Sequence, residues 1–142
     1  MQTIKFNRLN LSNEDFLLDM GCGEGRHSIG AHVSTEANIL GFDLSFKDLK
    51  IAKERLNDFD TSQIETICQF ASANITSIPL SDSSLDAVIC SEVLEHVDSP
   101  QESIKELIRV LKPGGVLAIS VPRYLPELIC WKLSKEYYQP PG

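Results

Sequence analysis

The residues best suited to chemistry are two carboxylates placed around a glycine-rich stretch. Asp19 opens the sequence Asp-Met-Gly-Cys-Gly-Glu-Gly, which ends at Gly25 and follows an apolar run at residues 16–18. A second acid, Asp43, closes the next apolar run, residues 38–43. A strand that passes through a glycine turn into a helix presents backbone N–H groups that attract an anion, and glycine lets a ligand approach the main chain. Together these features predict half of a nucleotide-type pocket.

Short apolar runs predict the strands that must position these residues. The expected strands cover residues 15–20, 37–42, 65–71, 85–90 and 115–121. Most of the runs are nearly continuous rather than alternating. That pattern is typical of strands buried on both faces of a parallel sheet covered by helices.

Helix signals separate the predicted strands. Ser45 and Ser99 are each followed three residues later by an acidic side chain, as at helix N-caps, and Pro100 suits the first helical position. Apolar residues then recur at helical spacing until the sequence Lys-Pro-Gly-Gly at residues 112–115 ends the second of these helices. A further helix is expected after Gly25.

Strands that alternate with helices predict an α/β fold with a doubly wound, mainly parallel sheet. Ligands of such sheets bind beyond the carboxyl ends of the strands, near the point where the strand order reverses. The glycine turn and Asp43 fall at that edge. So do four further residues: Asn74, Ser91, Glu92 and Pro122.

The chain of 142 residues is long enough for one domain, whose core we expect at residues 15–122. Residues 123–142 form a tail, in which 126–138 predicts a helix that carries many large apolar side chains. The sequence ends on Gln-Pro-Pro-Gly with no further strand signal, so we expect a domain that is truncated at its C-terminus.

Composition excludes several classes of protein. The net charge of −7 argues against broad electrostatic binding to nucleic acid. The cysteines are widely spaced, which favours reduced core thiols over a disulfide framework or a zinc site; they are Cys22, Cys68, Cys90 and Cys130. No stretch approaches the ~20 apolar residues of a membrane span, and no signal peptide is indicated. We therefore expect a cytoplasmic protein without a metal, nucleic-acid or membrane partner.

Several segments, in matching order, resemble class I S-adenosylmethionine (SAM)-dependent methyltransferases, in the small-molecule branch that includes quinone-biosynthesis methyltransferases. These segments are residues 17–25, 41–45, 73–79, 85–97 and 109–115. A single glycine motif is a weak signal, whereas several motifs in order are a strong one. The resemblance implies a Rossmann-like fold that transfers a methyl group from SAM to a small-molecule acceptor, with the tail at 123–142 beginning the acceptor-binding region.

The resemblance also implies how the amino-acid end of SAM is held. Its carboxylate would take N–H groups from the loop at Gly21, Cys22 and Gly23 and from the following helix start. Its ammonium group would face Asp19 and nearby carbonyls. Alternatively, Asp19 holds the glycine loop by accepting its N–H bonds, and both roles are compatible.

The nucleoside end of SAM would lie along the next two strand ends. Asp43 suits the ribose diol, because a carboxylate accepts two O–H bonds. Leu44 and Ile75 would cover the two faces of the adenine ring. Asn74 stands where the family usually has Asp at the adenine amino group, although an ordinary turn residue is the alternative. Ser91, at the end of the fourth strand, completes the expected SAM site.

The implied chemistry is in-line attack by a nucleophile on the SAM methyl group, in which the protein orients the reactants and excludes water. An acidic nucleophile needs no dedicated base. An alcohol or carbon acid would need one, and His96 is then the first candidate. The alternative is that His96 packs or bonds within its own loop.

Two other functions stay open at this point. A nicotinamide-linked dehydrogenase would share the glycine turn, but Arg26 occupies the last glycine position of that fingerprint. A non-catalytic domain of methyltransferase fold would bind SAM or a partner protein without transferring the methyl group. The sequence identifies neither the acceptor nor the oligomeric state.

Overall fold

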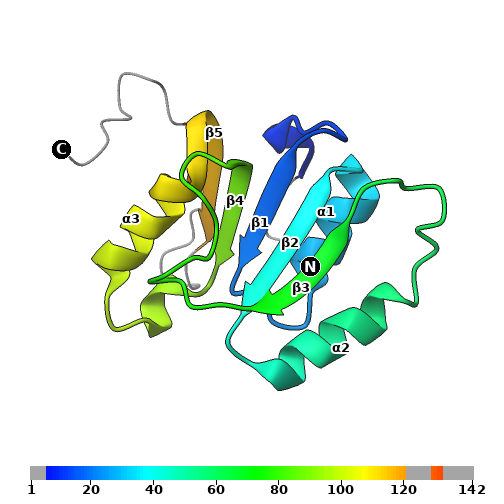
Figure 1. Ribbon diagram of the computed structural model, residues 1–142, viewed down its shortest axis with the longest axis horizontal. Helices are drawn as coiled ribbons and strands as arrows, with labels where there is room; N and C mark the ends of the chain where they lie inside the picture. Colours follow the sequence, from blue (N-terminus) through cyan, green and yellow to red (C-terminus); the bar gives the residue numbers. More distant parts are fainter. Residues whose placement is uncertain (1–5, 121–128, 133–142) are drawn as a thin grey trace.

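The computed structural model describes residues 6–120 and 129–132, which form a sheet with helices on both faces (Figure 1). The sheet has six strands in the order β3-β2-β1-β4-β5-β6. The strands β1 to β5 are parallel, and β6 is antiparallel to β5. Their bounds are β1 Phe16–Met20, β2 Asn38–Asp43, β3 Cys68–Ser72, β4 Leu85–Ser91, β5 Leu111–Ser120 and β6 Ile129–Lys132. The predicted doubly wound, mainly parallel sheet is therefore confirmed.

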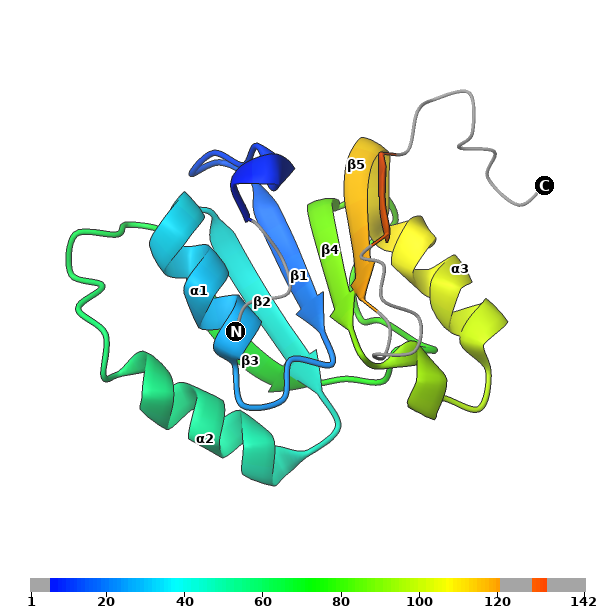
Figure 2. The same cartoon turned by 180° about the vertical axis from the view of Figure 1, so that it is seen from behind.

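The helices divide between the two faces of the sheet, as the view from behind shows (Figure 2). They are α1 Arg26–Thr35, α2 Phe46–Leu56 and α3 Pro100–Val110, with short 3₁₀ turns η1 Phe6–Leu9 and η2 Leu94–His96. Helix α1 and η1 pack on one face, and α3 packs on the other. Helix α2 joins α1 and β3 in a smaller cluster.

Burial on both faces explains why the strand sequences are continuously apolar. Leu17 and Leu18 are both fully buried, yet they belong to different clusters. Leu18 packs with Val88 and with Leu107 of α3, whereas Leu17 packs with Ala31 of α1. Successive side chains of a strand point to opposite faces, so both faces of the central strands need apolar residues.

The two predicted helix caps differ in the structure. The Ser45 hydroxyl accepts a hydrogen bond from the Asp48 N–H at 3.2 Å, so this cap is confirmed. The Ser99 side chain makes no capping bond. Instead, the Ser99 carbonyl accepts bonds from the N–H and the hydroxyl of Ser103, at 3.0 and 2.9 Å. Helix α3 nevertheless begins at Pro100, as predicted.

The predicted tail helix is wrong where the structure describes it. Residues Ile129–Lys132 form β6, which pairs with Val116–Ile119 of β5. The expectation that no further strand closes the sheet is wrong for the same reason. An open β5 edge would present a row of unpaired N–H and C=O groups, and the returning chain satisfies them. The remainder of residues 121–142, including Pro122, lies outside the described part of the chain.

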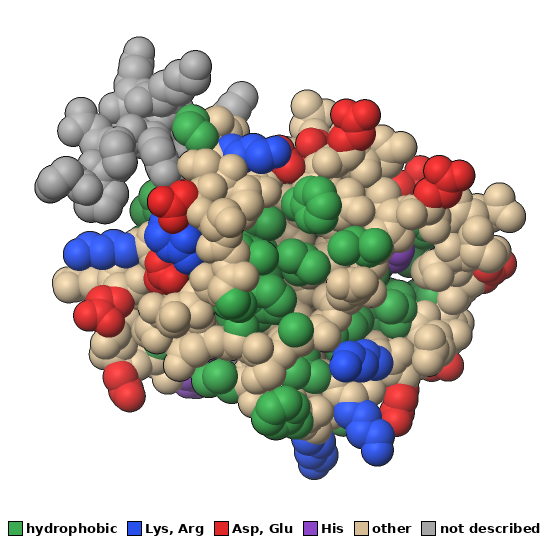
Figure 3. Space-filling view, viewed as in Figure 1, with side chains coloured by type: hydrophobic (Ala, Val, Ile, Leu, Met, Phe, Trp, Pro, Cys, Tyr) green, Lys and Arg blue, Asp and Glu red, His purple; other side chains and the backbone are tan. Residues whose placement is uncertain are grey.

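The face seen in Figure 1 is only partly covered by α3. The crossover at residues 73–84, between β3 and β4, is irregular and contains no helix. Figure 3 shows apolar side chains gathered in the middle of this face. The half-buried members of its cluster include Phe16, Leu40, Leu80 and Ile108. None of the described helices is long and apolar enough to cross a membrane.

Candidate functional site

A cleft of about 460 Å³ opens at the carboxyl ends of β1, β2 and β4. Seven residues that the sequence placed at this edge line it: Gly21, Asp43, Leu44, Ile75, Ser91, Glu92 and His96. Sequence reasoning did not assign the other lining residues, which are Met20, Ala73, Val93 and Val97. What these residues share is their position, because each is the last residue of a strand or lies in the segment that follows one. The predicted carboxyl-edge pocket is thus present in the fold.

The glycine loop is fastened to the end of β2 by its own backbone. The N–H groups of Gly21 and Cys22 both donate to the Phe42 carbonyl, at 2.7 and 2.9 Å. The Gly23 N–H donates to Asp43 Oδ2 at 2.8 Å. These donors were expected to face a ligand carboxylate, and in the structure they are already used. The first turn of α1 has N–H groups without intrahelical partners, of which the Ser28 N–H bonds Asp19, and no residue of this turn lines the cleft.

Two positions of the loop require glycine. Gly21 has φ +77, and a Cβ there would lie 2.3 Å from Val93 Cγ2. Gly25 has φ +86 and precedes α1 as its N-cap, and its Cβ would lie 2.9 Å from that of Ala52 in α2. The loop therefore packs directly against the segment after β4 and against α2.

Asp43 is held at the cleft wall by two backbone donors. Its Oδ1 accepts from the Ser45 N–H at 2.9 Å, while its Oδ2 accepts from Gly23. Because a carboxylate has about four acceptor sites, two remain for a ligand. Asp43 therefore joins the glycine loop, the start of α2 and the cleft in one side chain.

Asp19 lies beneath the loop and does not line the cleft. Its side chain is 1% exposed, and its Oδ2 accepts a bond from the Ser28 hydroxyl at 2.7 Å. Burial raises the pKa of Asp19 to about 6, and the nearby Asp43 carboxylate acts in the same direction. In this position Asp19 fixes α1 to β1, whereas the N–H groups of the glycine loop that it was expected to hold donate to Phe42 and Asp43 instead.

The described cysteines pack in the apolar clusters, where Cys22 and Cys90 are buried and Cys68 is half-buried. Cys22, Cys68 and Cys90 are free. Burial raises the pKa of the Cys22 thiol strongly and that of Cys90 to about 12. Both thiols are therefore protonated at neutral pH and are poor nucleophiles. The Cys130 side chain lies outside the described residues.

The crossover after β3 presents Ile75 to the cleft. The Asn74 Oδ1 accepts bonds from the N–H and the hydroxyl of Thr76, at 3.0 and 2.9 Å, which is an Asx turn. Asn74 is exposed and does not line the cleft, whereas Ile75 is buried. Leu44, across the cleft, is 64% exposed. The predicted residues Leu44 and Ile75 thus share the cleft, and Asn74 shapes the turn.

Arg109 of α3 is hydrogen-bonded to the same crossover. Its guanidinium donates to the carbonyls of Leu80 and Ile78, at 2.9 and 2.8 Å. The Ile78 N–H donates to Glu106 Oε1 at 2.9 Å. The hydrogen bond from Arg109 lowers the pKa of Glu106. This network ties the segment that carries Ile75 to α3.

The end of β4 carries polar groups at the cleft. The hydroxyl oxygens of Ser91 and Ser120 lie 2.7 Å apart. Glu92 has a left-handed backbone with φ +56, and its N–H donates to the Ser120 carbonyl at 3.0 Å. His96 is exposed, with its Nε2 3.6 Å from Glu95 Oε1. Within the described residues, no group of three or more His, Cys, Asp or Glu side chains is arranged to hold a metal ion.

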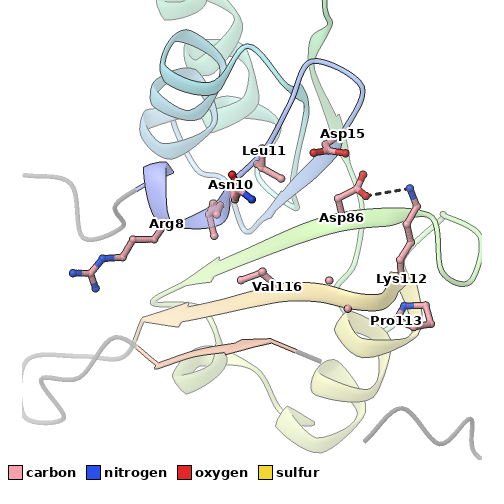
Figure 4. Close-up of a pocket in the computed structure, with 11 residues that line it drawn as sticks. Arg8, Asn10, Leu11, Asp15, Asp86, Lys112, Pro113 and Val116 are labelled. Carbon is pink, nitrogen blue, oxygen red and sulfur yellow. Dashed lines mark hydrogen bonds and ion pairs between the residues drawn. The ribbon is translucent and has the colours of Figure 1, made fainter. Parts of the chain in front are cut away.

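A second hollow of about 310 Å³ lies near the opposite, amino ends of β1 and β4 (Figure 4). Two of its charged groups pair with each other, because Lys112 Nζ lies 3.1 Å from Asp86 Oδ1, and the Phe16 N–H donates to Asp86 Oδ2 at 2.8 Å. None of the residues predicted from the sequence to bind SAM lies there. Parallel sheets bind ligands at the other edge, so the carboxyl-edge cleft is the candidate site.

A family model described as a methyltransferase domain matches residues 18–119, a range that includes the glycine loop, Asp43 and the end of β4. The chain belongs to this family. The resemblance to class I SAM-dependent methyltransferases, seen in the sequence motifs, is therefore confirmed for this methyltransferase domain.

Individual relatives agree with the family. The domain is 30% identical over 115 residues to methyltransferase GfsG of Streptomyces halstedii, covering 81% of this chain and 40% of that protein. It is 30% identical over 133 residues to demethylmenaquinone methyltransferase of Listeria welshimeri, covering 92% of this chain and 53% of that protein. The chain thus spans about half or less of the length of these relatives.

A solved structure shows the same fold. The crystal structure of the [4+2]-cyclase SpnF superposes with a TM-score of 0.71 at 29% identity, covering 80% of this chain and 40% of that chain. The methyltransferase domain described here therefore shares its architecture with an enzyme of that name as well as with methyltransferases.

Proposed function

We propose that this methyltransferase domain binds SAM in the carboxyl-edge cleft and serves the transfer of its methyl group to a small-molecule acceptor. The observation that carries the proposal is the placement of Asp43, which lines the cleft at the end of β2 while its Oδ2 holds the Gly23 N–H. The Asp43 carboxylate, which we assign to the ribose hydroxyls, is thereby bonded to the glycine loop as well. The name of the Listeria relative supports a small-molecule acceptor.

The residues fit the parts of SAM in an order that follows the strands. Asp43 has acceptor sites left for the ribose hydroxyls, and Leu44 with Ile75 offers apolar surfaces for adenine. The first turn of α1 offers N–H groups to the methionine carboxylate. Gly21, Cys22 and Gly23 give the loop its shape, and Asn74 shapes the turn that presents Ile75.

SAM supplies an activated methyl group on a sulfonium when it is bound. The residues of this chain position the donor and shield it, and such orientation can account for ~7–11 kcal/mol of a barrier. His96 lines the cleft with most of its side chain exposed, so its ring nitrogens are accessible to an acceptor. We assign His96 as the base for an acceptor that must lose a proton.

A second candidate function is a SAM-binding domain that catalyses no methyl transfer. It is favoured by the similarity to SpnF, because a [4+2]-cyclase on this fold shows that the fold alone does not fix the reaction. Turnover on any acceptor would decide in favour of the transferase.

Thermal unfolding with SAM, S-adenosylhomocysteine or NAD at equal excess tests the proposal. A ligand that binds only the native state stabilises it by RT ln(1 + [L]/Kd), about 2.7 kcal/mol at a hundredfold excess over Kd. We expect an increase in Tm with both adenosyl compounds and none with NAD. A shift with NAD alone would replace the proposal with the dehydrogenase alternative.

A screen of phenol, alcohol and carbon-acid acceptors then tests the role of His96. The His96→Ala variant should bind SAM with unchanged affinity and lose turnover on an alcohol or carbon acid. Unchanged turnover would leave His96 as a residue of the cleft wall.

A further inference from the structure

The ammonium group of a bound SAM needs an acceptor, and the polar side chains that line the cleft are those of Asp43, Ser91, Glu92 and His96. Asp19 is 1% exposed and already bonded to the Ser28 hydroxyl. Ser91 does line the cleft. The β1–β4 register pairs Leu17 with Ala87 and Asp19 with Ile89, so Gly21 and Ser91 each follow the last of these pairs by two residues, and both line the cleft. Ser91 is therefore level with the loop that would hold the amino-acid tail.

Ser120, at the end of β5, fixes the hydroxyl of Ser91. The two residues are partners in the β4–β5 register, and their hydroxyl oxygens are 2.7 Å apart. Ser120 is 3% exposed, and Ser91 is the partner of its hydroxyl among the described residues. A buried hydroxyl that bonds one neighbour keeps that neighbour in a single rotamer, because rotation of either side chain would leave it unpaired.

Whichever serine donates, the Ser91 hydroxyl can still accept a hydrogen bond from a ligand in the cleft. When Ser91 donates to Ser120, both lone pairs of Ser91 stay free. When Ser120 donates to Ser91, one lone pair stays free. The Glu92 N–H, which donates to the Ser120 carbonyl at 3.0 Å, holds the two strand ends together at this level. A backbone hydrogen bond and a side-chain hydrogen bond therefore both hold Ser91 and Ser120 together.

We propose that Ser120 is a positioning residue that holds the Ser91 hydroxyl as an acceptor for the ammonium group of SAM. The proposal rests on the proposed function, and it assigns a role to a buried serine that does not line the cleft. Ser120 acts only through Ser91, which is the residue that touches the ligand. Both serines therefore bear on the amino-acid end of SAM and not on its nucleoside end.

Two ligands that differ only in this end give the test. S-adenosylhomocysteine carries the amino-acid tail, and 5′-methylthioadenosine lacks it. Calorimetric Kd values for the 142-residue chain should show about tenfold weaker binding of S-adenosylhomocysteine in Ser91→Ala, because hydrogen bonds to charged groups are among the stronger ones. Ser120→Ala should weaken it about three- to fivefold. Binding of 5′-methylthioadenosine should be unchanged in both variants.

The double variant and a matched control sharpen the test. Since Ser120 acts through Ser91, Ser91→Ala/Ser120→Ala should bind S-adenosylhomocysteine no more weakly than Ser91→Ala alone. Ser103→Ala is the control, because Ser103 is equally buried and its hydroxyl bonds the Ser99 carbonyl in α3, away from the cleft. It should leave both affinities unchanged.

The outcomes separate this proposal from the proposed function. Additive losses in the double variant, equal losses for both ligands, or an unchanged affinity in Ser120→Ala would each overturn the role of Ser120. If Ser120→Ala does not fold, Ser120→Cys keeps a small side chain with a weak donor and should weaken S-adenosylhomocysteine selectively. Failure of the unmodified chain to bind either ligand would instead contradict the proposed function.

Discussion

The Asp43 carboxylate and the Gly23 N–H are 2.8 Å apart, and this bond connects the end of β2 to the glycine loop that follows β1. The residues are twenty positions apart in the chain. The same carboxylate accepts from the Ser45 N–H at the start of α2. A single side chain thus sets both the wall of the cleft and the position of its loop.

Replacing Asp43 should therefore impair two functions at once. We expect Asp43→Ala to weaken SAM binding by at least tenfold, because it removes the ribose acceptor and one anchor of the loop. Isothermal titration calorimetry measures the affinity. Glu54→Ala, which removes an exposed carboxylate from α2, is the control and should bind SAM normally. An unchanged affinity in Asp43→Ala would remove Asp43 from the site.

A methyl group at Gly21 should displace the loop. The added Cβ would lie 2.3 Å from Val93 Cγ2, and the residue has φ +77, so Gly21→Ala should lower both the free energy of unfolding and SAM affinity. Gly23→Ala is the comparison, because Gly23 has φ +54 with nothing within 4 Å of its Cβ. It should cost only about 1 kcal/mol of backbone strain.

Denaturant titration measures the free energy of unfolding of the two glycine variants, and calorimetry measures the SAM affinity of each. Val93→Ala removes the clashing methyl groups, so adding it to Gly21→Ala should restore part of the lost stability. If Gly21→Ala and Gly23→Ala were equally destabilised, the contact with Val93 would not be the cause.

The buried Asp19 should make stability depend on pH. Its pKa rises from the usual 3.8 to about 6 in the folded state, so the folded state binds the proton more tightly. The resulting stabilisation is complete below about pH 4 and is lost as the pH rises through 6. The difference between the two pKa values corresponds to a change of about 3 kcal/mol in the free energy of unfolding.

Comparison with Asp19→Asn isolates this effect, because asparagine stays neutral and keeps an oxygen for the Ser28 hydroxyl. From pH 4 to pH 7 the unmodified chain should lose stability relative to the variant, as measured by urea unfolding. Burial lowers the pKa of His27 to about 4, which acts in the opposite sense, but that contribution is common to both proteins and cancels. A constant difference between the two curves would argue against the raised pKa.

Arg109 should support the adenine side of the cleft from a distance. Its guanidinium holds the Ile78 and Leu80 carbonyls, so Arg109→Ala should free the crossover that carries Ile75. We expect a loss of about 2 kcal/mol in the free energy of unfolding and weaker SAM binding. Lys105→Ala, an exposed change on the same helix, is the matched control and should alter neither quantity. Normal SAM affinity in a destabilised Arg109→Ala would confine its role to folding.

The centre of the sheet could be predicted because its strands are apolar on both faces, unlike the largely exposed edge strand β3. Leu17 and Leu18 show how burial on opposite faces produces a continuous run that a sequence displays directly. The last parallel strand begins at Leu111 rather than near residue 115, because Leu111 pairs with Leu85 across an irregular register. Residues 129–132 form a strand against an expected helix, since pairing with β5 outweighs the apolar spacing of the tail.

The site could be predicted only as far as local motifs describe it. The glycine loop and Asp43 stand at strand ends, so their convergence follows from the topology. The use of the Gly21 and Cys22 N–H groups by the Phe42 carbonyl is a contact between two strand ends that no motif encodes. The clamp of Arg109 on Ile78 spans thirty-one residues and depends on how α3 packs. Such long-range bonds emerge only from the folded chain.

The double use of the Phe42 carbonyl has a consequence for how a two-part ligand assembles on this protein. Phe42 and Asp43 are neighbours, and both accept hydrogen bonds from the glycine loop. A nucleoside fragment bound at Asp43 would therefore restrict the motion of the backbone that anchors this loop. A free amino acid would then meet a loop already in its final shape, with less entropy left to lose. We expect the two halves of the methyl donor to bind cooperatively even when no covalent bond joins them.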